Sequence, residues 1–269
     1  MPSLRALLRL GLSGPVLAPN APDSANFPAL PRPEQPLCII GDLHGMADLL
    51  DAMLNRIADQ PGAASTRILL VGDLIDRGPD SAAVLRRVHD LCRQEPDYVT
   101  CLMGNHERMM LDFLAAPAAL AKRWLTAGGD QTLRSFGLVA RVPQDLAAAR
   151  HFAQVGAALH DALQPDLLDW LAALPLYWQT DGLAVVHADA LSDRPMVDQP
   201  AATLLWGHAA TTLPRQDGLW LVHGHATVPK VQIGDGRIAV DTGAWHSGRL
   251  SALWLDGDGA RVISVSQPG

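Results

Sequence analysis

The 269-residue sequence is poor in cysteine, in aromatic residues and in charge, and each shortage excludes a class of protein. Three Cys in so long a chain cannot form the dense disulfide framework of a small secreted scaffold. Only 18% of the residues are charged and 48% are hydrophobic, a balance that excludes an intrinsically disordered chain. No apolar run is long and unbroken enough to predict a transmembrane helix.

Basic residues are also scarce, since the net charge is −7 and the pI is about 5.7. Nucleic-acid binding needs stripes of Lys and Arg, so we expect no nucleic-acid partner. The apolar run near the N-terminus is interrupted by Arg9 and followed by Gly and Pro, which is not typical of a signal peptide. Without such a signal, and with three Cys outside any CxxC pair, we expect a cytoplasmic protein.

The remaining composition fits one large folded domain with short connections. Residues 16–36 contain six Pro and little periodicity, so we expect an N-terminal extension or linker over 1–35 and a single domain over 36–269. Within the domain, short apolar runs alternate with segments of helical periodicity. The expected strands are 36–40, 67–71 and 98–103, and the expected helices are 45–60, 81–92 and 107–114.

The second half of the chain has a different pattern. Residues 115–178 are rich in Ala and Leu and predict a helical insertion, with breaks at 128–129 and 137. Apolar runs then predict strands at 183–186, 219–222, 237–240 and 250–255. The whole order predicts an α/β (α+β) fold, in which helices cover a sheet.

Three predicted strands end in the same way, with Gly followed by Asp42, by Asp73 and by Asn105. The intervals between them are 31 and 32 residues, each the length of one strand and one helix. Each polar residue alone is explained as well by a helix N-cap. Three such endings at nearly equal spacing favour a shared site at the carboxyl edge of the sheet, where α/β proteins bind ligands.

Two buried carboxylates at one edge repel each other unless a cation lies between them. The later half of the chain adds imidazoles, because His187 and His225 follow further predicted strands. Mixed oxygen and nitrogen ligands suit Mn, Fe, Zn or Mg. The pattern therefore predicts a metal site rather than a set of helix caps.

The segments that carry these residues are GDLHG (41–45), GDLIDRG (72–78), GNHE (104–107), VVHAD (185–189), HGH (223–225) and DTGA (241–244). In this order they resemble the phosphoprotein-phosphatase type of calcineurin-like metallophosphoesterase, especially the bacterial and phage serine/threonine phosphatases of the lambda type. The resemblance implies a β-sandwich of two mixed sheets flanked by helices.

The resemblance also implies a role for each residue. It implies two divalent metal ions, manganese first, with Fe, Zn, Ni or Mg as alternatives. It implies hydrolysis of phosphomonoesters by in-line attack of a hydroxide that bridges the metals. His106 would be the general acid, Asp76 would orient it, and Arg77 would bind the phosphate. The implied metal ligands are Asp42, His44 and Asp73 for the first ion, and Asp73, Asn105, His187 and His225 for the second.

One position departs from this pattern. The family usually has a second phosphate-binding Arg two residues after a Trp, and here that stretch reads Trp206-Gly207-His208. His lacks the planar fork of Arg, so we hypothesise that His208 supplies only part of that function. Arg215 is another possible substitute, and His246 is a further candidate for the mouth of the site.

Three functions compete at this stage. The leading one is a phosphatase for phosphoserine or phosphothreonine proteins or for small phosphoesters. The alternative is a dinucleoside-tetraphosphate hydrolase, an enzyme class that tends to lack Asp76 and to carry Asp in place of Glu107. The third is a non-catalytic protein that binds phosphorylated partners, supported only by the departure at His208.

Overall fold

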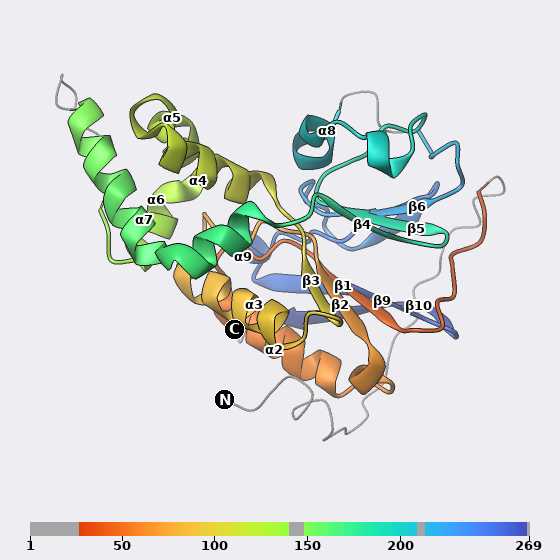
Figure 1. Ribbon diagram of the computed structural model, residues 1–269. Coiled ribbons are helices and arrows are strands. Elements are labelled where there is room, and N and C mark those ends of the chain that lie inside the picture. The colour runs from red at the N-terminus through yellow and green to blue at the C-terminus, as the bar shows by residue number, and fades with distance from the viewer. Residues whose placement is uncertain (1–26, 140–147, 209–212, 268–269) are drawn as a thin grey trace.

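The computed structural model describes residues 27–139, 148–208 and 213–267. Two five-stranded sheets face each other, and helices cover their outer sides (Figure 1). A lobe of helices, from α4 (Asn105–Ala115) to α7 (Ala148–Ala172), extends from one end of this sandwich. The two mixed sheets with flanking helices confirm the expected fold class.

The first sheet has the strand order β10-β9-β1-β2-β3. Its parallel half confirms the predicted alternation of strands and helices, with α2 (Ala47–Ala58) and α3 (Ser81–Gln94) as the connections. Strand β10, which the sequence analysis did not predict, forms a long hairpin with β9. The bounds are β1 Leu37–Ile40, β2 Arg67–Leu70, β3 Val99–Cys101, β9 Arg249–Asp256 and β10 Gly259–Ser266.

The second sheet has the order β4-β5-β6-β8-β7, with β5, β6 and β8 parallel. The two edge strands, β4 and β7, pair antiparallel with their neighbours and were not predicted. The short helix α8 (Ala201–Trp206) covers its outer face (Figure 1). The bounds are β4 Tyr177–Thr180, β5 Leu183–Val186, β6 Trp220–His223, β7 Gln232–Gly234 and β8 Arg237–Ala239.

The alternation of side chains along each strand divides the apolar core into layers. In β1, Leu37 and Ile39 point between the sheets, and Cys38 and Ile40 point toward the helices. The inter-sheet layer is fully apolar, so the two sheets are held face to face with their parallel strands ending on one side of the molecule.

The helical insertion is shorter than the predicted 115–178. Its elements are α5 (Pro117–Trp124), a π-helical turn (Leu125–Gly129), α6 (Asp130–Ser135) and α7 (Ala148–Ala172). The prediction was wrong at its end because Tyr177 and Trp178 belong to β4. The turn Asp181-Gly182 folds β4 back onto β5, and Gly182 has a φ of 76° that favours glycine.

The described part of the predicted extension packs against the second sheet. The ring of Phe27 meets that of Trp220 edge to face, and the Trp220 indole donates a hydrogen bond to the Pro28 carbonyl. Residues 1–26 of that extension lie outside the described residues. Within the described ranges, no helix has both the length and the apolar character needed to cross a bilayer.

Candidate metal centre

Six residues that the sequence analysis proposed as metal ligands lie at the strand ends where the two sheets meet. These residues lie just after β1, β2, β3, β5 and β6. This is the carboxyl edge at which the sequence analysis expected them. Among the described residues, two groups of possible ligand atoms form here, both contain Asp73, and the first also includes His106, the proposed general acid. The first group is His44, Asp73 and His106, and the second is Asp73, His187 and His225.

Asp73 is the centre of this arrangement. Its Oδ2 lies 3.5 Å from Nε2 of His44, and its Oδ1 lies 3.4 Å from Nε2 of His187. The carboxylate is buried, and the surrounding imidazoles hold its pKa below the ordinary value although burial alone would raise it. An ionised, buried carboxylate between two imidazole clusters can be shared by two cations.

The imidazoles present their lone pairs to this carboxylate. Nδ1 of His44 lies 2.7 Å from the Ile75 carbonyl, and Nδ1 of His187 lies 2.9 Å from the Val71 carbonyl. Each Nδ1–H therefore donates to a backbone oxygen, and each Nε2 keeps a lone pair that faces Asp73. Burial lowers the pKa of His44 to about 3 and lowers that of His187, so both rings stay neutral.

A lone pair that faces a carboxylate oxygen is repulsive unless a cation lies between them. The donor set of Asp73 and neutral imidazoles is therefore the set that a divalent metal requires. Asn105 belongs to the second group, since its Oδ1 lies 2.8 Å from Nε2 of His187 and 3.0 Å from Nδ1 of His225. The residues present fit metal ions on both sides of Asp73.

Asp42 lies at the rim of the cluster rather than within either group. Its carboxylate accepts the backbone N–H of His225, at 3.0 Å and 3.2 Å from its two oxygens. Burial raises its pKa well above the ordinary value, and the nearby carboxylates of Asp241 and Asp73 raise it further. The buried carboxylates of Asp42, Asp73 and Asp241 repel one another, so a cation among them would be stabilising.

The backbone is held in an uncommon conformation around the cluster. His44, Asp73, Asp76, Arg77 and His225 all have positive φ, between 44° and 72°. Residues other than glycine rarely adopt this region, and such backbone strain concentrates at functional sites. Two glycines allow the backbone to approach the carboxylates closely. A Cβ on Gly104 would lie 2.2 Å from Oδ1 of Asp73, and one on Gly224 would lie 2.0 Å from Oδ1 of Asp42.

Three predicted catalytic side chains form a connected set beside Asp73. Nδ1 of His106 lies 2.6 Å from Oδ2 of Asp76, and its Nε2 lies 3.2 Å from Nη2 of Arg77. Burial lowers the pKa of His106, but the carboxylates of Asp73 and Asp76 outweigh this and raise it above the ordinary value. His106 can thus hold a proton beside the metal ligands, and Arg77 offers a guanidinium at the same point.

Four further residues support the site and were not assigned a role from the sequence. Trp124 and Thr132, from the helical insertion, donate to the Asp76 carboxylate. Glu107 accepts backbone N–H groups of Asp73, Leu74 and Gly104, which fixes the loop after β2. Asp241 is buried beside Asp42. Glu107 and Asp241 belong to the motifs GNHE and DTGA, so the sequence could have identified them. No local sequence signal marks Trp124 or Thr132.

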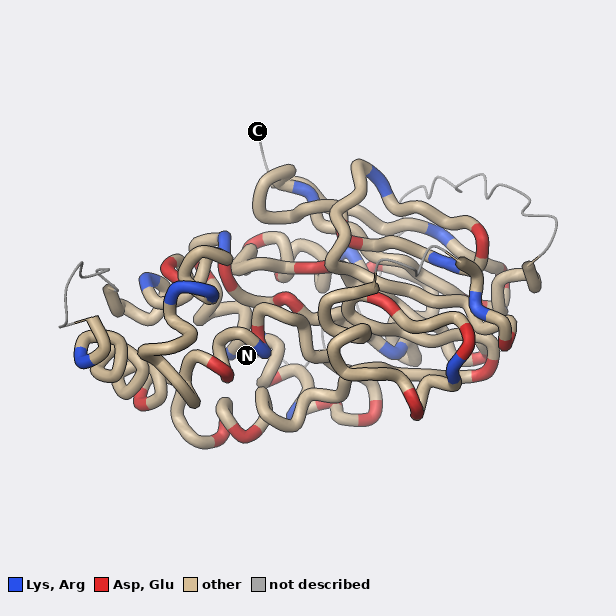
Figure 2. The backbone as a smooth tube through the Cα atoms, turned by 90° about the horizontal axis from the view of Figure 1, so that it is seen from above, with Lys and Arg blue, Asp and Glu red and all other residues tan. Residues whose placement is uncertain are grey.

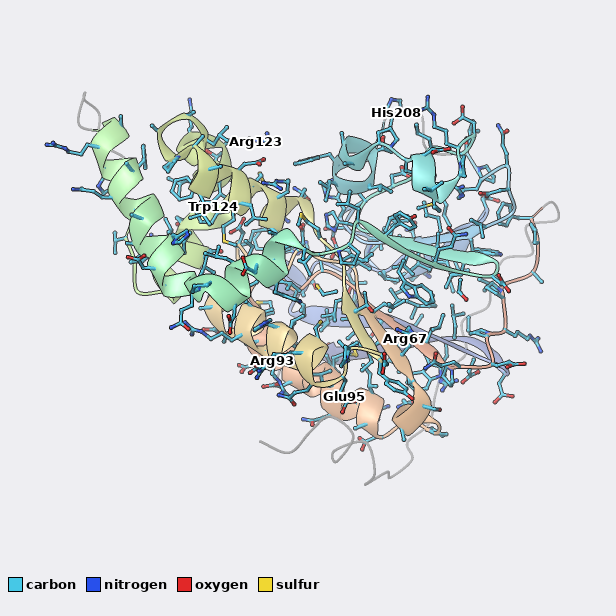
Figure 3. All side chains as sticks on the ribbon, in the orientation of Figure 1. Arg67, Arg93, Glu95, Arg123, Trp124 and His208 are labelled. Atoms are coloured by element: carbon cyan, nitrogen blue, oxygen red, sulfur yellow. The ribbon has the colours of Figure 1, made fainter. Side chains whose placement is uncertain are left out.

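Three further candidates from the sequence are His208, His246 and Arg215. His208 is exposed beyond the end of α8 (Figure 3). His246, on α9 (Ala244–Ser247), is exposed and stacks on the half-exposed Trp245, whose ring lies 5.4 Å from Cζ of Arg77. Arg215 is buried and donates to Asp217 and to the carbonyls of Leu191 and Arg194, so its guanidinium is committed to the fold.

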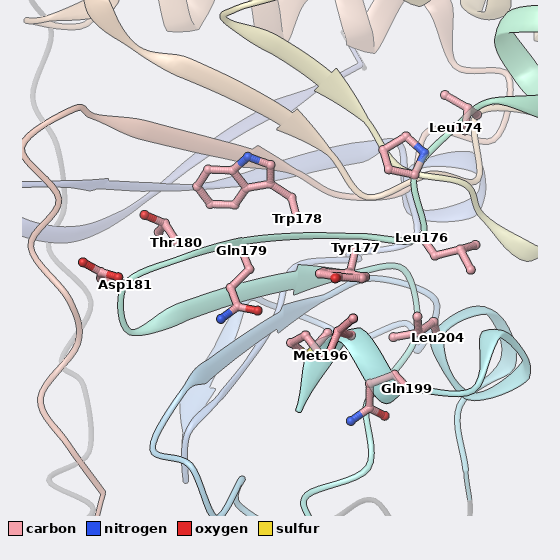
Figure 4. Close-up of a pocket in the computed structure, with 12 residues that line it drawn as sticks. Leu174, Leu176, Tyr177, Trp178, Gln179, Thr180, Asp181, Met196, Gln199 and Leu204 are labelled. Carbon is pink, nitrogen blue, oxygen red and sulfur yellow. The ribbon is translucent and has the colours of Figure 1, made fainter. Parts of the chain in front are cut away.

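The rest of the described surface has mixed character. Figure 2 shows acidic and basic residues interspersed along the chain rather than gathered into a basic stripe. A groove along the edge strand β4 has a volume of about 880 Å³ (Figure 4). Its walls hold one carboxylate, Asp181, and no imidazole, so it lacks the groups that phosphoester chemistry needs.

Comparison with known proteins agrees with this geometry. The family model of the calcineurin-like phosphoesterases matches residues 36–261. Serine/threonine-protein phosphatase 2 of Escherichia coli (strain K12) is 28% identical over 229 residues, which cover 79% of this chain and 89% of that protein.

Another relative carries a different name. The symmetrical bis(5'-nucleosyl)-tetraphosphatase of Pseudomonas fluorescens (strain SBW25) is 32% identical over 151 residues, 55% of this chain and 41% of that protein. Among solved structures, a candidate diadenosine tetraphosphatase superposes with a TM-score of 0.59 and 20% identity, over 90% of this chain and 97% of that one. At this identity the likeness concerns the fold alone.

Proposed function

The chain belongs to the calcineurin-like phosphoesterase family, and we propose that it is a metal-dependent hydrolase of phosphomonoesters. The observation that carries the proposal is the position of Asp73, whose Oδ2 faces the neutral imidazole of His44 and whose Oδ1 faces that of His187. A shared carboxylate of this kind is what a two-metal phosphoesterase requires.

Two divalent ions are the proposed cofactors, with Asp73 as the shared ligand. We assign His44 to one ion and His187, His225 and the adjoining Asn105 to the other. Asp42 is assigned to the first ion by the family resemblance, with manganese as the expected metal and Fe, Zn, Ni or Mg as alternatives. When bound, such ions lower the pKa of water and offset the negative charge of the phosphate. The site becomes attractive to anions even though the whole chain carries a net charge of −7.

The chain's own residues then bind and orient the substrate. Arg77 would bind the phosphate through its guanidinium fork, since its Nη2 lies 3.2 Å from Nε2 of His106, the ring nitrogen that faces the site. His106 would donate the proton from Nε2 to the leaving oxygen, a role worth about 10²–10⁴-fold in rate. Asp76 would hold the imidazole by its Nδ1–H and stabilise its charged form.

The proposed substrates are phosphoserine or phosphothreonine proteins or small phosphomonoesters, and the proposed compartment is the cytoplasm. The match to a bacterial serine/threonine-protein phosphatase over most of both chains supports the substrate class. The second candidate is hydrolysis of dinucleoside tetraphosphates, which the match to a symmetrical tetraphosphatase supports. Asp76 and Glu107 favour the phosphatase, because the tetraphosphatases tend to lack this Asp and to carry Asp at the second position.

Parallel assays test the proposal. Purified protein with Mn²⁺ is given p-nitrophenyl phosphate, a phosphoserine peptide and diadenosine tetraphosphate at equal concentrations. The proposal expects turnover of the first two that disappears in Asp73→Asn and persists in Asp161→Asn, a change at an exposed carboxylate of α7. Preference for diadenosine tetraphosphate would support the second candidate, and no turnover of any ester would overturn both.

A further inference from the structure

We propose that Arg123 determines substrate preference by binding a second anionic group, a phosphate or a carboxylate, that lies near the scissile phosphate. This inference rests on the proposed phosphoesterase activity and concerns which esters the site prefers. Arg123 belongs to helix α5 of the insertion, and none of the motifs in the sequence includes it.

The first observation is the position of the guanidinium. Cζ of Arg123 lies 5.4 Å from the ring centroid of Trp206, the last residue of α8. Figure 3 labels Arg123 and Trp124 on α5, and Figure 1 shows α5 in the helical lobe and α8 above the second sheet. The pair therefore connects the helical lobe with the helix that covers the second sheet, two elements that also share the larger apolar cluster through Leu205.

Both helices that carry the pair are hydrogen-bonded to loops of the metal centre. On the α5 side, the next residue, Trp124, donates a hydrogen bond to Asp76, which in turn holds His106. On the α8 side, the carbonyl of Leu204 accepts the backbone N–H of Ala188, the residue after His187.

His106 and His187 lie on opposite oxygens of Asp73, at 3.8 Å and 3.4 Å. Each of the two elements that carry the Arg123–Trp206 pair is therefore hydrogen-bonded to a loop of the centre. In the proposed binding mode, the part of the substrate beyond the phosphate at Asp73 extends between these two elements and meets the pair.

The second observation is the charge of Arg123. The residue is exposed, and the described residues include no carboxylate within ion-pair distance of it. Contact with an indole face orients a guanidinium while its N–H edges remain available in the plane. Those edges match the oxygens of a phosphate or carboxylate, so Arg123 is a preformed anion-binding group at the rim.

The scissile phosphate itself has another partner. Nη2 of Arg77 lies 3.2 Å from Nε2 of His106, so this guanidinium is the one assigned to the scissile phosphate. Arg123, whose contact with Trp206 places it at the rim, is therefore available for an anion further along the substrate. A neighbouring phosphate of a polyphosphate chain or an acidic residue beside a phosphoserine would supply that anion.

The test compares Arg123→Ala with Lys122→Ala, a neighbouring exposed cation that contacts no described aromatic ring. Four substrates are used: p-nitrophenyl phosphate, which has no second anion, diadenosine tetraphosphate, and phosphoserine peptides with and without flanking glutamates. We expect Arg123→Ala to lower kcat/KM about five- to tenfold, through KM, only for substrates with a second anion. Arg123→Lys should recover part of the loss, and Lys122→Ala should change little.

A loss confined to the tetraphosphate identifies the second anion as phosphate, and a loss confined to the acidic peptide identifies it as carboxylate. An equal loss on all four substrates, an equal effect of Lys122→Ala, or no effect of Arg123→Ala would overturn the proposal. Failure of the wild-type protein to hydrolyse any of the four substrates would instead refute the phosphoesterase activity on which it depends.

Discussion

Nε1 of Trp124 lies 3.0 Å from Oδ2 of Asp76, a residue 48 positions earlier in the chain. The indole belongs to the helical insertion, and the carboxylate belongs to the loop after β2. Thr132, also from the insertion, donates to the other oxygen of Asp76 at 2.6 Å. The insertion therefore does more than cover the sandwich, because it fixes the carboxylate that orients His106.

This relationship predicts that Trp124→Phe lowers activity without loss of metal. The substitution keeps an aromatic ring in the buried position and removes the N–H that holds Asp76. We expect kcat to fall roughly tenfold, the value of one hydrogen bond to a charged group. Trp254→Phe is the matched control, since that buried indole donates to Asp256, a residue of β9 outside the cluster. Equal losses in the two variants would contradict the assigned role.

A second prediction separates acid catalysis from metal binding at His106. This imidazole lies 3.8 Å from Oδ2 of Asp73, within reach of the first ligand group, so geometry allows either role. As the general acid, His106→Asn should lower kcat by about 10²–10⁴-fold and leave metal content unchanged. The loss should be larger for an alkyl phosphate than for p-nitrophenyl phosphate, whose leaving group needs no proton. Loss of one metal ion per chain would identify His106 as a ligand instead.

A third prediction concerns the loop that holds Arg77. The backbone N–H of Arg77 donates to the Gly128 carbonyl, and a Cβ on Gly128 would lie 2.7 Å from that nitrogen. Gly128→Ala should therefore displace Arg77 and weaken inhibition by inorganic phosphate about tenfold. Gly137→Ala is the control, because Gly137 also has positive φ but nothing lies within 4 Å of its Cβ position. Both variants lose some stability, and only the first should lose phosphate affinity.

A fourth prediction tests the layer between the sheets. Leu69 of β2 is fully buried in that layer, and Leu69→Ala should lower the free energy of unfolding by about 2–5 kcal/mol. Val197 is 76% exposed, so Val197→Ala should stay within about 0.5 kcal/mol of the wild type. Urea denaturation followed by tryptophan fluorescence measures both, and a cost below about 1 kcal/mol for Leu69→Ala would contradict the assigned core.

The sequence was informative where the signal is local. The Gly-Asp and Gly-Asn endings identified the strand edge, and the apolar runs located most of the central strands within one or two residues. The edge strands were harder, because β4 and β7 are only partly buried and contain no continuous apolar run. Their turns, Asp181-Gly182 and Asp235-Gly236, were the available signal.

Other features depend on contacts between distant segments and could not be predicted locally. The hydrogen bonds of Trp124 and Thr132 to Asp76 span 48 and 56 positions. The orientation of the His44 and His187 rings depends on carbonyls 31 and 116 positions away. The hydrogen bonds of Arg215 to the carbonyls of Leu191 and Arg194, 24 and 21 positions away, likewise depend on how the chain folds.

The central claim is that two divalent metal ions bound around Asp73 are required for hydrolysis. The most direct test is to strip the purified protein with a chelator and add Mn²⁺ back stepwise, while bound metal and p-nitrophenyl phosphate turnover are measured on the same samples. The account predicts that turnover is absent from the stripped protein and reaches its maximum as binding saturates at two ions per chain. Full turnover with no metal, or saturation at a single ion, would contradict it.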